Sequence, residues 1–284
     1  MSTQSEIDAG AKAICFAIST ALENDDGALI GRNGSIELEC MIYARSSDVL
    51  EKNAGIFPLS SFALWREASL KASVSANVLA TGWYEPLKDQ EAYALQRWGS
   101  VAIKIPLRSL EPYYVDSDKC WTRLLAGHKV AVVSCFTESA KKQVSQVSSI
   151  WPTKPVLPLD IEWHWIQTGH PPSVACGQNE WPPHVSSWTD AVNHVVSEVV
   201  RSGARFALIG CGGLGMLIAK ELKDRGIIAI VLGGAIQVLF GIKGKRWASH
   251  SVISNFWNSK WIWPSNTETP AGYVGVEGGC YWQG

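Results

Sequence analysis

Several glycine-containing turns in this sequence carry the residue types that bind phosphate groups. The first is Gly210-Cys211-Gly212-Gly213-Leu214-Gly215, between an apolar run and an amphipathic helical pattern. Gly212 and Gly213 let backbone amides approach an anion, and the N-terminus of the following helix attracts negative charge. Gly210 and Gly215 belong to the same predicted site. Tight packing of the strand against the helix is the alternative explanation for these glycines.

A second turn, Gly233-Gly234, follows the next apolar run and leads into the basic segment Gly241–Trp247. Arginine offers a two-pronged donor to a diphosphate, and lysine offers a mobile point charge. Lys243, Lys245 and Arg246 are therefore candidate phosphate ligands. A solvated basic turn at a helix end is the alternative, and the helix dipole favours it as well.

A third turn, Arg32-Asn33-Gly34-Ser35-Ile36-Glu37, also follows an apolar run and opens a helical pattern. Glu37 falls in the first turn of that helix, where a carboxylate can hold a metal or a sugar hydroxyl, or act as a base. Arg32 would pair with phosphate or orient Glu37. The alternative for Glu37 is a capping acid stabilised by the helix dipole. Further predicted ligand contacts in this turn are Asn33, Gly34 and Ser35.

The C-terminal stretch Val276–Trp282 is glycine-containing, apolar and aromatic, which favours a docked segment over a frayed end. We predict that Glu277 faces the binding pocket, and packing alone is the competing explanation. The chain contains neither a HExxH zinc motif nor a GxSxG nucleophile elbow. A serine hydrolase of the usual type is therefore disfavoured.

Alternating strand and helix patterns must position these turns. Clear β-branched or apolar runs occupy 28–31, 77–82, 101–105, 129–134, 204–209 and 227–232, and one short strand is expected near 156–163. Helices are expected at 5–22, 35–44, 59–76, 90–98, from about 138, at 187–202, 216–225 and 235–240. This alternation predicts a doubly wound, mostly parallel α/β sheet with Rossmann-like halves. In such sheets ligands bind beyond the carboxyl ends of the strands.

The 284 residues are 46% hydrophobic and 18% charged, enough to bury a large core in one domain. We divide it into approximate halves, 1–150 with the Arg32–Glu37 turn and 151–284 with the glycine-rich turns. A net charge of −1 argues against nucleic acid as a partner. The polar N-terminus and the lack of a long apolar run predict no transmembrane segment and a cytoplasmic location. Seven cysteines without CxxC spacing predict reduced thiols.

A dinucleotide cofactor does not fit the glycine turn at 210–215. A Rossmann site expects an acid about 20 residues further on, at the end of the next strand, to hold the ribose. That strand ends here in Val231-Leu232-Gly233-Gly234, with no acid. An NAD-dependent oxidoreductase is therefore disfavoured.

Three stretches resemble a group of bacterial and viral proteins encoded among polysaccharide genes: 30–37, 125–136 and Leu232–Trp247 (LGGAIQVLFGIKGKRW). Gln237 lies in the third stretch and is a further candidate ligand contact. The first stretch is also similar to the Arg-x-Gly-Asp-Gly-Glu motif of GT-D glycosyltransferases. Arg32, Gly34 and Glu37 match that motif, whereas Ser35 stands where the family has Asp and Ile36 where it has Gly.

This resemblance implies a GT-D-like glycosyltransferase that moves a sugar from a nucleotide-linked donor, UDP-linked by preference, to a glycan acceptor. It also implies a divalent metal (Mn²⁺ or Mg²⁺) at Glu37. Because Ser35 replaces the family's Asp, the dependence on a metal stays an open question. The alternative from another class is a non-catalytic nucleotide-binding or scaffold module of a glycan pathway. A homodimer is compatible with the sequence.

Overall fold

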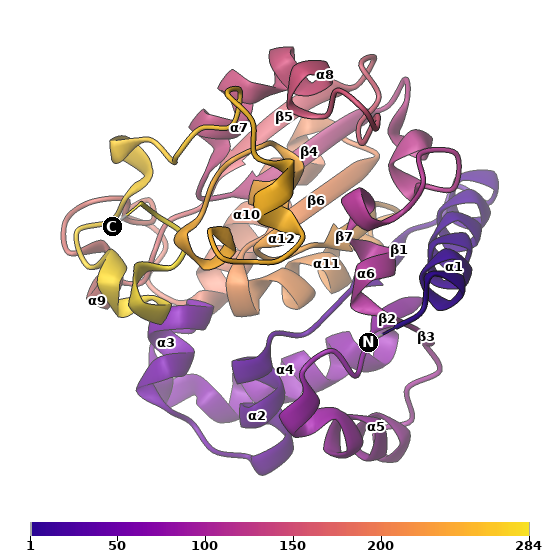
Figure 1. Cartoon of the computed structure of the whole chain (residues 1–284). Coiled ribbons are helices and arrows are strands. Elements are labelled where there is room, and N and C mark those ends of the chain that lie inside the picture. Colours follow the sequence, from indigo (N-terminus) through magenta and orange to yellow (C-terminus); the bar gives the residue numbers. More distant parts are fainter. Residues whose placement is uncertain (1, 284) are drawn as a thin grey trace.

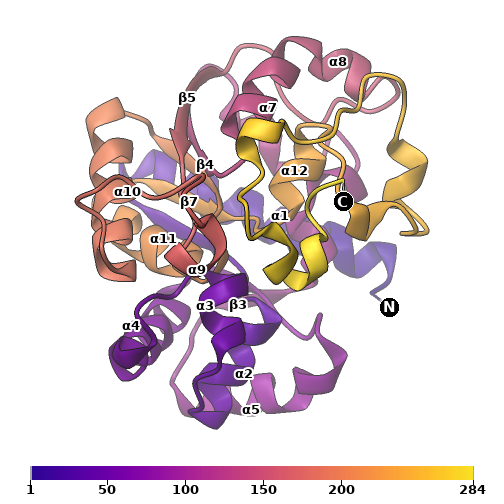
Figure 2. The same cartoon turned by 90° about the vertical axis from the view of Figure 1, so that its left-hand side faces the viewer.

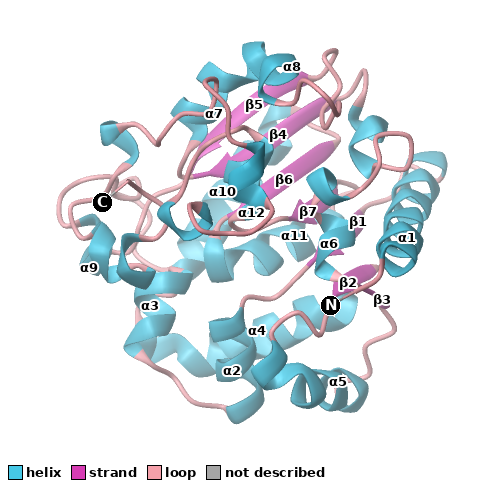
Figure 3. Ribbon diagram, in the orientation of Figure 1, coloured by secondary structure: helices cyan, strands magenta, loops and turns pink. Residues whose placement is uncertain are grey.

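A single seven-stranded sheet forms the centre of the molecule in a computed structural model that describes residues 2–283. The strand order is β3-β2-β1-β7-β6-β4-β5, and every neighbouring pair is parallel. The strands are β1 (Ala28–Gly31), β2 (Val78–Ala80), β3 (Ile103–Ile105), β4 (Lys129–Ser134), β5 (Glu162–Gln167), β6 (Phe206–Gly210) and β7 (Ile228–Val231). The predicted α/β class with a parallel sheet is confirmed (Figures 1 and 3).

The longer α-helices are α1 (Gln4–Glu23), α2 (Ser35–Tyr43), α3 (Asp48–Ala54), α4 (Phe62–Ser75), α5 (Lys88–Arg97), α7 (Thr137–Gln143), α10 (Trp188–Ser202) and α11 (Gly215–Lys223). The shorter ones are α6 (Leu107–Leu110), α8 (Val147–Ile150), α9 (Pro172–Ala175) and α12 (Ala235–Leu239). Single turns of 3₁₀-helix include η3 (Pro112–Tyr114), η6 (Gly212–Leu214), η7 (Lys245–Trp247), η8 (Ile253–Phe256) and η11 (Glu277–Gly279).

The sheet is covered on both faces because its central strands are apolar at every position. In β6, Phe206 and Leu208 belong to one buried cluster, and Ala207 and Ile209 belong to the other. This is the period-two alternation of a strand that is buried on both sides. Figure 2 shows α10 and α11 on one side of the sheet and α7 and α12 on the other. The fold is therefore doubly wound.

The two halves of the sequence interleave within the sheet. Strand β4 lies between β5 and β6, and β1 pairs with β7 through Leu29 and Ala229. Strands from both halves therefore bring their carboxyl ends to the same edge. No helix among residues 2–283 is long and apolar enough to cross a membrane.

The region 151–183 departs most from the sequence-based expectation. The strand expected near 156–163 is wrong in position, because β5 occupies Glu162–Gln167 instead. Pro155 and Pro158 lie in the preceding segment, and proline has no backbone N–H to donate to the ladder with β4. The strand begins only after the last of these prolines. It pairs along its whole length with β4.

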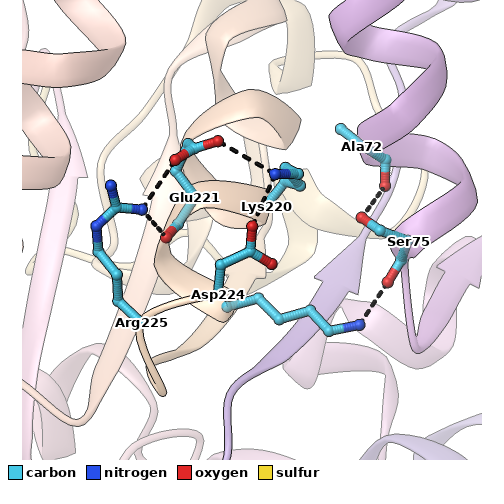
Figure 4. Close-up of polar contacts among 7 residues, drawn as sticks. Ala72, Ser75, Lys220, Glu221, Asp224 and Arg225 are labelled. Atoms are coloured by element: carbon cyan, nitrogen blue, oxygen red, sulfur yellow. Dashed lines mark hydrogen bonds and ion pairs between the residues drawn. The ribbon is translucent and has the colours of Figure 1, made fainter.

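Charged side chains fasten the C-terminal end of α11 (Figure 4). Lys220 pairs with Asp224 at 2.7 Å and Arg225 with Glu221 at 2.8 Å, both at i,i+4 spacing. Such half-exposed pairs contribute only about 0.3–0.5 kcal/mol each. Lys223 reaches across to the carbonyl of Ser75 at the end of α4, at 2.6 Å. This contact joins two helices of the same layer.

The buried carboxylate of Glu268 ties the C-terminal segment to the start of α7. It accepts hydrogen bonds from the backbone amides of Ser139 at 3.0 Å and Ser265 at 3.2 Å, and from the Ser139 hydroxyl. Only 1% of Glu268 is exposed. Removing a buried acceptor leaves its donors unpaired, at a cost of about 1–3 kcal/mol per group.

We therefore expect Glu268→Ala to lower the free energy of unfolding by about 3 kcal/mol, because the buried amide and hydroxyl of Ser139 lose their acceptor. Urea denaturation followed by tryptophan fluorescence measures this change. Glu39→Ala, at an exposed position of α2, is the matched control and should stay within about 0.5 kcal/mol of the wild type. Equal effects of the two substitutions would show that Glu268 does not anchor this segment.

Candidate functional site

A cavity of about 400 Å³ lies at the carboxyl edge of the sheet. Its walls are the segments that follow β1, β2, β4, β5, β6 and β7, together with α3, Arg246 and the C-terminal residues 276–282. The predicted site residues among its lining residues are Arg32, Gly34, Ser35, Glu37, Gly210, Gly212, Gly233, Gly234, Gln237, Arg246 and Glu277. Three turns far apart in sequence thus share one cavity. Its size suits a small organic ligand.

Glu37 lies where the Arg32–Glu37 turn meets the Gly210–Gly215 turn. A β-carbon on Gly34 would collide with the Glu37 carboxylate, so the side chain folds back over the start of its own helix. A β-carbon on Gly213 would lie 3.3 Å from Cγ of Glu37, which places the η6 turn on the opposite side. Withdrawal from bulk water raises the pKa of Glu37, and nearby Glu277 raises it further, while its backbone hydrogen bond and Arg32 oppose the shift. A raised pKa makes a carboxyl a better proton acceptor than an ordinary glutamate.

Arg32 bridges the turns after β1 and β7. Its guanidinium lies 5.0 Å above the ring of Trp83. It also presses against Gly233, where a β-carbon would collide with it and where φ is +57°. Only glycine satisfies both conditions at this position. Half-buried, Arg32 presents a cation at the edge of the sheet without a carboxylate partner among residues 2–283.

Arg246 is the second cation at the cavity, and it holds the C-terminal segment in place. It donates a hydrogen bond of 2.6 Å to the Tyr281 hydroxyl and lies 3.5 Å from the Glu277 carboxylate. Its guanidinium also stacks 4.9 Å from the centre of the Tyr281 ring. Burial raises the pKa of Tyr281 to about 12, so the phenol stays neutral. The cavity therefore holds two arginines and two glutamates.

Three buried polar atoms at the cavity have no hydrogen-bond partner among the described residues: Oε1 of Gln237, Nε2 of His170 and Nε1 of Trp83. The other end of the Gln237 amide donates to the carbonyl of Tyr281 at 3.1 Å, which fixes the side chain. Burial lowers the pKa of His170 to about 4, so its ring is neutral at pH 7. Unpaired buried polar groups are costly. A ligand in the cavity could supply partners for these three atoms.

Five predicted site residues do not line the cavity: Asn33, Gly213, Gly215, Lys243 and Lys245. Asn33 is buried and accepts a hydrogen bond from Ser73 in α4, and Gly215 packs against Val231. The lysines correct the prediction of a three-cation clamp. Successive residues of a 3₁₀ turn point about 120° apart, so Arg246 lines the cavity and Lys245 does not. Lys243 instead lies over the ring of Trp257.

The sequence-based search missed several lining residues, among them Trp83, Cys135, Phe136, Thr168 and His170. They share a position, because each follows a strand: β2, β4 or β5. The topological rule for parallel sheets could have found them. Their residue types gave no signal, since none belongs to a glycine turn or a charged motif. Cys135 and Cys211 line the cavity as thiols, with burial raising the pKa of each.

The carboxylates Glu37 and Glu277 are the acidic groups that a divalent metal would meet here. Among residues 2–283, no group of three or more His, Cys, Asp or Glu side chains is arranged to hold a metal ion. Mg²⁺ at nucleotide sites commonly uses only one or two carboxylates and completes its shell with phosphate and water. A metal at Glu37 would therefore depend on a phosphate ligand, and it stays a prediction.

We find no match to this chain among protein-family models, curated proteins or solved structures. The case for a function therefore rests on the residues at the cavity.

His170 should make stability depend on pH in the acid range. A histidine with a lowered pKa in the folded state is protonated first in the unfolded state, so folding stability falls as pH drops from 6.5 toward 4. We expect the wild type to lose up to about 2 kcal/mol from this group between pH 7.5 and pH 5. In His170→Gln this part of the loss should vanish, while the change between pH 7.5 and pH 8.5 stays as in the wild type. Urea denaturation at the three pH values measures it, and identical acid slopes would contradict a buried neutral ring.

Proposed function

We propose that the cavity binds the diphosphate of a nucleotide sugar and that the protein transfers the sugar to a glycan acceptor. The observation that carries this proposal is the meeting of Arg32, Arg246 and Glu37 at one cavity on the carboxyl edge of a parallel sheet. The cations suit a diphosphate, and the carboxylate suits a sugar hydroxyl or a proton. The sugar itself is inferred from the resemblance of the Arg32–Glu37 turn to the GT-D glycosyltransferases.

Departure of the nucleoside diphosphate is the step that this site would assist. Negative charge builds on the leaving phosphate oxygen, and fixed cations and amides lower the energy of that charge. Arg246 is held by Tyr281, and Arg32 by Trp83 and Gly233, so neither has to reorganise when the charge develops. The backbone amides of Gly212 and Gly234 are further candidates on the same rim. This arrangement is the preorganised electrostatics that transfer requires.

Glu37 would position the donor sugar through its hydroxyl groups. Burial raises its pKa and so favours the protonated form, which can donate as well as accept a hydrogen bond. A donor-bound Mg²⁺ or Mn²⁺ would favour the charged form and would supply charge neutralisation at the diphosphate. The aromatic rings of Trp83, Tyr84 and Trp181 line the same cavity and offer flat faces for a base or a pyranose.

The first test is the binding of UDP by isothermal titration calorimetry. Arg246→Ala should weaken binding by roughly tenfold to hundredfold, because a charge-assisted contact contributes about 1.5–3 kcal/mol. Lys245→Ala is the matched control, since Lys245 is the adjacent cation and is exposed away from the cavity. It should leave the affinity unchanged. Equal losses in the two variants would indicate a diffuse charge effect and remove Arg246 from the site.

The second test separates a transferase from a non-catalytic binding module. Release of UDP from a panel of UDP-sugars, measured with and without a glycan acceptor, should fall by roughly 10²–10⁴-fold in Glu37→Gln. The affinity for UDP should be retained, because the variant keeps the size of the side chain. Glu39→Gln on the same helix is exposed and should behave as the wild type. Tight UDP binding with no turnover in the wild type would favour the module.

A cytoplasmic location stays a prediction.

A further inference from the structure

A second cavity, of about 1040 Å³, adjoins the first. Trp83 and Arg246 line both cavities, so these two side chains form the partition between them. The remaining walls come from the segments after β2 and β3, from the region of α6 and from residues 246–253. The indole N–H of Trp83 has no hydrogen-bond partner among residues 2–283. The partition therefore offers an unused donor to a ligand.

Glu111 lies in the wall of this second cavity, directly after α6. The cations that act electrostatically on its carboxyl group are Arg32, Arg108 and Arg246, and two of these, Arg32 and Arg246, also line the first cavity. Among the described residues none of these arginines lies within ion-pair distance of its carboxylate. Burial raises the pKa of Glu111 to about 7, against the opposing effect of these arginines. Arg32 and Arg246 would thus lie between Glu111 and the diphosphate that we propose for the first cavity.

The outer part of the second cavity carries cations and aromatic rings. Arg108 lies 4.9 Å above the ring of Tyr114, which fixes the guanidinium in place. Lys104 is exposed in β3, and neither Lys104 nor Arg108 forms an ion pair within residues 2–283. The other charged groups are less available, because Lys88 faces Glu85 at 3.9 Å and Glu6 caps α1 through Thr3.

The remaining titratable groups facing Glu111 or its cavity are Tyr113, Tyr114 and His250. Burial raises the pKa of both tyrosines, so both phenols are neutral at pH 7. Burial lowers the pKa of His250, with Arg108 adding to the effect, so its imidazole is neutral as well. Glu111 is therefore the group in this cavity that changes charge near neutral pH.

We infer that the second cavity is the acceptor subsite, that it takes an anionic saccharide, and that Glu111 accepts the proton from the attacking hydroxyl. The inference rests on the proposed function, since it places the donor in the first cavity. The acceptor's phosphate or carboxylate group would lie at Arg108 and Lys104. Its ring would lie toward Trp83 and Trp247.

In the resulting step the acceptor hydroxyl oxygen forms a bond to the anomeric carbon of the donor. The bond from that carbon to the diphosphate oxygen breaks, and its electron pair leaves with the nucleoside diphosphate. The hydroxyl proton passes to the Glu111 carboxylate. Arg246 lines both cavities, so it can stabilise the negative charge on the leaving diphosphate. Glu111 lines the second cavity, where it would accept the proton of the acceptor hydroxyl.

Binding of glucose 1-phosphate, with glucose as the uncharged comparison, tests the subsite independently of turnover. Calorimetry should show glucose 1-phosphate binding to the wild type and at least a tenfold loss in Arg108→Ala. UDP binding should be unchanged in that variant. Lys141→Ala, an exposed lysine on α7, is the control and should bind both ligands as the wild type does. Unaltered glucose 1-phosphate binding in Arg108→Ala, or its complete competition by UDP, would overturn the subsite.

The pH profile of UDP release from UDP-sugars tests Glu111. Wild-type turnover should fall below about pH 7 as the carboxylate is protonated. In Glu111→Gln turnover should drop by roughly 10²–10⁴-fold at pH 8 and lose that acid limb. Glu111→Asp should keep the limb at a lower rate, and UDP affinity in both variants reports intact folding. An unchanged profile in Glu111→Gln would overturn the proton-acceptor role.

The two proposals fail in distinguishable ways. If UDP does not bind but glucose 1-phosphate binds through Arg108, the nucleotide-sugar function is wrong, and Glu111 loses its role with it. If UDP binds and is released from a donor while Arg108→Ala and Glu111→Gln behave as the wild type, the donor site stands and the second cavity is not the acceptor subsite.

Discussion

The parallel direction of all seven strands is the constraint from which the candidate site follows. Each strand delivers its carboxyl end to one edge, so six separate chain segments must meet there whatever their sequences. The five inner strands are almost wholly apolar and buried on both faces, which leaves the edge as the place for polar chemistry. Helices on both faces leave that edge open. The cavity is thus a product of the sheet's topology, and the residue types decide what it binds.

Charge is distributed around the partition between the two cavities in a balanced way. Arg32 and Arg246 lie between Glu37 and Glu277 on one side and Glu111 on the other. With no ligand the cations and acids offset one another, and an incoming diphosphate would compete with the acids for the two arginines. The glycines beside Glu37 and Arg32 are as important to the site as the charges, because they leave room for these two side chains. A β-carbon at Gly34 or Gly233 would displace Glu37 or Arg32.

Sequence periodicity predicted the sheet because buried parallel strands are continuous apolar runs, as in Lys129–Ser134 and Ile228–Val231. The meeting of Glu37, Gly212 and Arg246 could be expected from strand ends alone. The direction of each side chain could not, which is why Lys245 was grouped with Arg246 although consecutive residues of a 3₁₀ turn point in different directions. Glu111 belongs to none of the motifs that the sequence analysis identified. It follows a three-residue strand with two exposed positions, and its environment exists only after α6 and residues 246–253 pack around it.

The pairing of β1 with β7 has a consequence for how the molecule reaches its native state. Leu29 pairs with Ala229, so the two central strands come from near opposite ends of the chain. Closing so long a loop is entropically unfavourable, and sheets dominated by distant contacts form slowly. Until that pairing is made, β1 exposes an apolar edge that is prone to non-native association. Refolding yield from denaturant is therefore governed by protein concentration and by the lifetime of the unpaired N-terminal strands.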